Sequence, residues 1–110
     1  MFGKKGIQHP EAISVEGLDL LDNSVEVARL WVEDGGPATC IIQPERLAEP
    51  EMFGMLMVDA IRHGARAFSQ CYGMTEEEAL SRVWQGVDME RGDPSSPLDT
   101  VQNYEEGGLN

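Results

Sequence analysis

The chain has 110 residues, of which 41% are hydrophobic, and its 20 acidic and 8 basic residues give a formal net charge of -12. This length is typical of one domain with a single core. The charge disfavours nucleic acid and anionic membranes as partners, because binding to phosphates depends on basic side chains that displace counterions. We expect the acidic charge to provide solubility. The more specific alternative is that it binds a basic protein partner.

The sequence has no apparent export or membrane signal. The N-terminal residues lack the apolar stretch of a secretory signal peptide. The longest apolar run, residues 52–58, is too short to span a bilayer. Cys40 and Cys71 lie among apolar residues outside any Cys-x-x-Cys motif, so we expect small buried side chains in a reducing compartment. We therefore expect a cytoplasmic protein.

The two ends of the chain are predicted to lie outside the globular domain. Residues 1–12 show no periodic pattern and form a predicted N-terminal arm, whereas residues 93–110 are an acidic tail rich in Pro, Ser and Gly. The single domain is predicted over residues 13–92. At its start, Ile13 and Val15 alternate with polar residues, which allows a short, weak strand.

Residues 23–34 fit a helix better than a strand. A capping residue is available at positions 22–24, and Val27, Leu30 and Trp31 follow helical spacing. The alternative is a β-hairpin that turns at residues 34–36 and pairs with the strand that follows. We prefer the helix, because the consecutive apolar residues 30–32 break the alternation of a half-buried strand.

The principal strand is predicted over residues 38–43, between Pro37 and Pro44. Apolar side chains occur on both of its faces. A strand needs a partner, which is either the segment 13–15 of the same chain or the same strand of a second copy across a two-fold axis.

The longest helix is predicted over residues 50–72, with Pro50 in its first turn and Gly73 after its end. Its first half is apolar all round and should be buried on most sides, which is difficult for one small chain to achieve. We therefore predict a homodimer. The interface is expected to contain five side chains: Met52, Met55, Met57, Cys40 and Ile42.

A further helix is predicted over residues 75–91. Thr75 and Glu78 have the spacing of a capping box, and Gly92 can end the helix. The predicted fold class is therefore α+β, with three helices over about residues 23–34, 50–72 and 75–91 and one principal strand.

The candidate catalytic and binding side chains lie on one face of the predicted long helix. Asp59 and His63 are four residues apart and can form a hydrogen bond, which is half of many catalytic arrangements but also an ordinary surface pair. Arg62 and Arg66 lie beside them and, with His63, can bind a small molecule or anion, or can pair with Asp59 and a neighbouring acidic loop. We prefer the structural interpretation of both pairs.

No metal or cofactor site is predicted. Cys40, Cys71, His9 and His63 would have to converge, but His63 and Cys71 are about 12 Å apart along one helix, whereas zinc ligands lie about 2 Å from the metal. No phosphate-binding loop or dinucleotide motif is present, so we expect no cofactor.

The runs VARLWVEDGG, EPEMFGMLMVDAIRHGARAFSQ and TEEEALSRVWQG resemble a family of small alphaproteobacterial proteins classed as a domain of unknown function. The resemblance covers about residues 13–92, and its most specific pieces are the WVEDGG turn and the DAIRHGARA helix face. It implies a bacterial cytoplasmic setting and a helix–strand–helix–helix order, and it carries over no catalytic residue.

We rank three functions on these grounds. The first is a non-enzymatic interaction or accessory module that acts as a homodimer. The alternative is a small-molecule or anion binding module that uses Arg62, Arg66 and His63. The last is an enzyme that uses the Asp59–His63 pair, and the absence of convincing catalytic spacing places it last.

Overall fold

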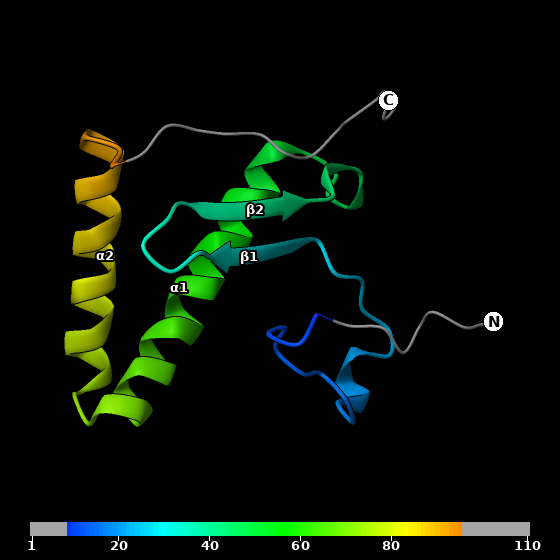
Figure 1. Ribbon diagram of the computed structural model, residues 1–110, viewed down its shortest axis with the longest axis horizontal. Coiled ribbons are helices and arrows are strands. Elements are labelled where there is room, and N and C mark those ends of the chain that lie inside the picture. The colour runs from blue at the N-terminus through cyan, green and yellow to red at the C-terminus, as the bar shows by residue number, and fades with distance from the viewer. Residues whose placement is uncertain (1–8, 96–110) are drawn as a thin grey trace.

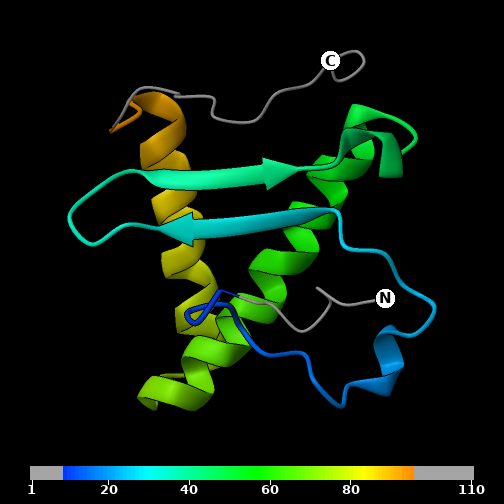
Figure 2. The same ribbon diagram turned by 45° about the vertical axis from the view of Figure 1, so that its right-hand side comes forward.

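The computed structural model describes residues 9–95 of the chain. It has an α+β architecture in which an antiparallel β-hairpin precedes two helices (Figure 1). Figures 1 and 2 show the hairpin lying across one side of the helix pair, with the segment before β1 on the side of β1 that faces away from β2. The elements in chain order are η2 (Asp19–Leu21), β1 (Ala28–Val32), β2 (Ala38–Ile42), η3 (Pro44–Arg46), α1 (Pro50–Tyr72) and α2 (Glu76–Gly92).

The predicted helix over residues 23–34 is wrong, and the β-hairpin alternative is confirmed. Leu30 lies opposite Cys40 and Trp31 opposite Thr39 in the antiparallel register. The turn is closed by the N–H of Gly36, which donates to the carbonyl of Glu33 at 2.8 Å, and Gly35 takes the left-handed conformation with φ of 70°. Gly35 thus allows the chain to turn tightly between the two strands.

The weak strand predicted at residues 13–15 is also wrong, because that segment is not a strand in the described chain. The strand predicted over 38–43 is β2, and it pairs with β1 instead. A hairpin partner reached through a five-residue loop costs less loop-closure entropy than a partner more than twenty residues away.

The two long helices are confirmed almost to the residue. Gly73 ends α1 in the left-handed conformation, with φ of 76°, and its N–H donates to the carbonyl of Ser69 at 3.0 Å. Thr75 is the extended cap before α2, and its Oγ1 accepts the N–H of Glu78 at 3.0 Å. Thr75 is therefore the N-cap, and α2 begins one residue after the predicted start.

The small core of the described residues lies in the helix pair. Among residues 9–95 the buried hydrophobic side chains are Ala65 of α1 and Ala79 of α2, with exposed fractions of 1% and 2%. Small side chains at these positions let the two helices approach closely. The extensive contacts between described elements are α1 with α2 and β1 with β2.

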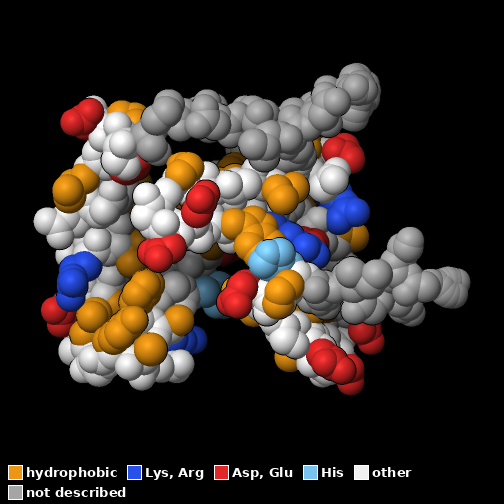
Figure 3. All heavy atoms as spheres, viewed as in Figure 1, with side chains coloured by type: hydrophobic (Ala, Val, Ile, Leu, Met, Phe, Trp, Pro, Cys, Tyr) orange, Lys and Arg blue, Asp and Glu red, His pale blue; other side chains and the backbone are white. Residues whose placement is uncertain are grey.

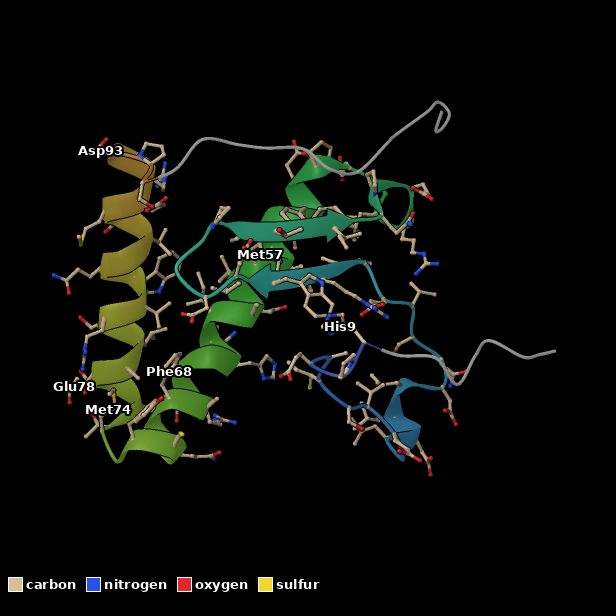
Figure 4. All side chains as sticks on the ribbon, in the orientation of Figure 1. His9, Met57, Phe68, Met74, Glu78 and Asp93 are labelled. Atoms are coloured by element: carbon tan, nitrogen blue, oxygen red, sulfur yellow. The ribbon has the colours of Figure 1, made fainter. Side chains whose placement is uncertain are left out.

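Many large apolar side chains are exposed on the β-hairpin, on the two helices and on the segment before β1. Figure 3 shows hydrophobic side chains gathered on the surface between the lower halves of α1 and α2, where Figure 4 places Phe68. The rings of Phe68 and Tyr72 stack there with centroids 5.8 Å apart. The exposed large apolar side chains of the whole described chain are those of Ile13, Val15, Leu18, Leu20, Leu21, Val25, Leu30, Val32, Ile41, Met52, Met55, Val58, Phe68, Tyr72, Trp84 and Met89.

The expectation that both cysteines are buried is wrong. Cys40 and Cys71 are free thiols with exposed side chains, because one lies on an edge strand and the other in the last turns of α1. No helix within residues 9–95 is long and apolar enough to cross a membrane. Most of the predicted N-terminal arm and of the predicted acidic tail lies outside the described residues.

Candidate functional site

The residues singled out on the long helix do come together in one place. Asp59, Arg62, His63 and Arg66 line a surface hollow of about 180 Å³ with Glu76. The first four lie on one face of α1 because their spacings of three and four residues correspond to about one helical turn. Glu76 joins them from the acidic first turn of α2, which is the neighbouring acidic segment that the sequence offered as a partner.

The charges in this hollow are already paired. Arg62 Nη1 lies 4.0 Å from Asp59 Oδ1, and Arg66 Nε lies 3.2 Å from Glu76 Oε2. The two arginines and the two carboxylates cancel formally. All four charged side chains are more than half exposed, so each pair contributes little to stability and can be exchanged for another partner.

The two residues of the catalytic alternative, Asp59 and His63, both line the hollow. The carboxylate of Asp59 faces Arg62, and no hydrogen bond between described residues joins it to His63. Residues 9–95 also contain no group of His, Cys, Asp and Glu side chains that could hold a metal ion.

The residues expected at an interface divide between exposed and half-buried positions. Met52, Met55 and Cys40 are exposed, whereas Met57 and Ile42 are half-buried. In the view of Figure 4, Met57 lies where the β-hairpin crosses α1. Exposed methionines on α1 agree with the expectation that one chain cannot bury the whole first half of this helix.

Sequence reasoning missed a second and larger hollow. A groove of about 690 Å³ runs between the segment 11–25 and the strand β1. Apolar residues line most of it, and among its residues Trp31 contacts the ring of His9 edge-on with centroids 5.0 Å apart. The alternation of Ile13 and Val15 was the available signal, but those side chains line a groove and do not belong to a strand.

The structure thus defines a class of small α+β proteins in which a β-hairpin is followed by an antiparallel helix pair. The sequence matches the family model of a domain of unknown function, DUF5076, over residues 17–95, and the chain belongs to this family. The resemblance to a family of unknown function is thereby confirmed. The helix–strand–helix–helix order that it implied is wrong, because residues 28–32 form the strand β1. No curated protein matches the sequence significantly.

The fold is also similar to that of a solved structure from the photosynthetic bacterium Rhodopseudomonas palustrus CGA009, provisionally described as a pyruvate dehydrogenase. The TM-score is 0.63 and the sequence identity is 28%. The match covers 88% of this chain and 99% of the other.

Proposed function

We propose that this protein is a non-enzymatic interaction module that acts as a homodimer. The observation that carries the proposal is its small core: the described residues bury only Ala65 and Ala79 among their hydrophobic side chains. Burial of apolar surface is the main favourable term in folding, and it must offset the conformational entropy of the ordered chain. A second copy that covers the exposed apolar surface supplies what the single chain lacks.

The first half of α1 and the strand β2 form the proposed interface. Met52 and Met55 expose flexible apolar side chains on α1, and Cys40 lies at the centre of β2. Antiparallel pairing of β2 with its copy would place Cys40 opposite Cys40 of the second chain and Ala38 opposite Ile42. Such a self-complementary contact closes after two subunits.

Molar mass by light scattering over a dilution series tests the dimer. We expect a mass of two chains that persists on dilution, and Met55→Glu should lower it because a buried charge disrupts an apolar interface. Met89→Glu is the matched control, since both methionines have the same exposed fraction of 68% and Met89 lies on α2. A monomer at every concentration would refute the proposal.

Oxidative cross-linking tests the position of β2. In a Cys71→Ser background, Cys40 is the single thiol. Opposed residues of an antiparallel pair have Cα atoms about 4.5–5.5 Å apart, which lies within the range of a disulfide. We expect a covalent dimer to form rapidly, at a rate that does not depend on protein concentration. Slow cross-linking at a concentration-dependent rate would place the interface elsewhere.

A second candidate function is anion binding at the hollow on α1. The observation that favours it is the convergence of Arg62, His63 and Arg66, although an anion must displace Asp59 and Glu76. A thermal-shift series with phosphate, sulfate and small carboxylates tests it, because a ligand that binds only the folded state raises the melting temperature. Pyruvate belongs in the series because of the provisional description of the similar structure.

The control for the anion series is another exposed arginine. Arg82 pairs with Glu78 at 3.9 Å on α2, away from the hollow. Stabilisation by an anion should disappear in Arg66→Gln and persist in Arg82→Gln. A flat series, or equal loss in both variants, would remove this candidate.

A further inference from the structure

We infer that the groove between the segment 11–25 and β1 binds an extended peptide of a partner protein, apolar at alternate positions and basic between them. The peptide would add to β1 as a third strand. This inference rests on the proposed function as an interaction module and deepens it, because it names the partner chemistry and assigns it to a surface other than the proposed dimer interface.

The walls of the groove are apolar. Ile13, Val15, Leu21 and Val25 line one side, and Leu30 lies on β1 opposite them, all with exposed side chains. The volume of about 690 Å³ lies in the range of natural ligand sites, which are mostly apolar with a few polar groups. An exposed apolar groove of this size indicates a binding surface.

The edge of β1 offers unused backbone hydrogen-bonding groups along this groove. The N–H of Gln43 donates to the carbonyl of Val27 at 2.9 Å, and the N–H of Glu33 donates to the carbonyl of Pro37 at 3.4 Å. Because facing groups alternate along a strand, the N–H and C=O of Ala28 and Leu30 point away from β2. No backbone hydrogen bond from residues 9–95 reaches them.

An extended peptide fits these groups better than a compact ligand does. Strand addition to a sheet edge uses backbone hydrogen bonds for affinity and pockets for alternate side chains for specificity. In Figures 1 and 2 the segment before β1 lies beyond this edge, so an added strand would have β1 on one side and that segment on the other.

The charge around the groove selects a basic partner. Residues 9–28 contain five carboxylates and no Lys or Arg. Arg29, the one arginine of β1, lines the groove and is already paired with Glu26 through contacts of 2.9 Å, and Arg46 donates to the backbone carbonyl of Glu26. Complementary charge steers association and excludes acidic competitors. The five carboxylates belong to Glu11, Glu16, Asp19, Asp22 and Glu26.

A direct binding experiment uses the fluorescence of Trp31, which lines the groove. The variant Trp84→Phe leaves Trp31 as the single tryptophan. The probe is a synthetic, terminally blocked seven-residue peptide of alternating Lys and Val, titrated at low salt. The matched peptide of alternating Glu and Val has the same apolar pattern and the opposite charge. We expect saturable binding of the first, weakened by salt, and none of the second.

Two N-methylated peptides test strand addition itself. Methylation of every second backbone nitrogen removes the N–H groups from one edge of an extended peptide. The two peptides differ in phase, that is, in which edge of the extended peptide carries the methyl groups. The phase that removes the N–H donors facing β1 should abolish binding, and the other phase should bind like the parent peptide. Equal binding of both phases would overturn the inference.

Paired surface variants locate the site. Ile13→Asp should weaken binding of the Lys–Val peptide at least about tenfold, since it removes an aliphatic side chain that the peptide would bury. Leu20→Asp should leave binding unchanged, because Leu20 lies on the same segment but not on the groove. Both side chains are largely exposed, at 90% and 78%, so neither change should unfold the chain, and the two variants add the same charge.

The outcomes separate this inference from the proposed homodimer. A dimer that does not bind the Lys–Val peptide, or binds the Glu–Val peptide equally well, overturns the groove alone. A monomer that binds the Lys–Val peptide with the expected N-methyl pattern overturns the dimer alone. Dissociation of the dimer by Ile13→Asp would make the groove a subunit interface and would overturn the peptide site.

Discussion

The guanidinium Nε of Arg66 on α1 lies 3.2 Å from the carboxylate Oε2 of Glu76, the first residue of α2. The pair bridges the two helices beside the turn that reverses the chain. Within that turn the hydroxyl of Ser69 donates to the carbonyl of Met74 at 2.7 Å. The helix pair is thus joined near the turn by short-range polar contacts and by the burial of Ala65 and Ala79.

The Arg66–Glu76 pair should contribute little to the free energy of unfolding. A double-mutant cycle with Arg66→Gln and Glu76→Gln should give a coupling energy of about 0.2–1 kcal/mol that decreases in high salt, because both side chains are more than half exposed. Denaturant unfolding at a fixed protein concentration measures it. A coupling above about 2 kcal/mol would show that the pair is desolvated, which the exposed geometry does not allow.

The turn between the helices should depend strongly on Gly73. Its φ of 76° is a left-handed conformation, so Gly73→Ala should lower the free energy of unfolding by about 1–2 kcal/mol. Gly86→Ala in the middle of α2 is the control with the opposite sign. An added Cβ at Gly86 meets nothing within 4 Å, and alanine should raise the stability by about 0.8–1 kcal/mol. The same sign for both variants would contradict the assignment of the turn.

The cap of α2 provides a third test. Thr75→Ala should lower the free energy of unfolding by about 1 kcal/mol, because the N–H of Glu78 loses its acceptor. Thr75→Ser keeps a hydroxyl at this position and should retain most of the stability. If the serine variant were as unstable as the alanine variant, the methyl group and not the hydrogen bond would be responsible.

The contact between the helices should not tolerate larger side chains. Ala65→Leu should destabilise the fold by about 1–3 kcal/mol, since the side chain of Ala65 is almost fully buried. Ala60→Leu is the control on the exposed side of the same helix and should have little effect on the free energy of unfolding. Thermal or denaturant unfolding of both variants makes the comparison, and equal effects would contradict the observed packing.

The cluster on α1 shows how far the sequence leads toward a site. Helical spacing was sufficient to predict that Asp59, Arg62, His63 and Arg66 share a face, because that spacing follows from the helix alone. The preferred interpretation, in which the arginines pair with Asp59 and a neighbouring acidic segment, is confirmed, but which carboxylate meets which arginine was left open. Asp59 faces Arg62 and not His63, and Glu76 reaches Arg66 only because the chain reverses at Gly73.

The sequence by itself determined the two helices, because their signals are local. Pro50, Gly73 and the Thr75–Glu78 cap act within a few residues, and the structure retains all of them. Tertiary structure decided the fate of residues 28–32. Their consecutive apolar side chains fit either a helix stripe or an edge strand, and only pairing with β2 across the glycine turn resolves the choice. A strand takes its hydrogen bonds from elsewhere in the chain, whereas a helix takes them from its own residues.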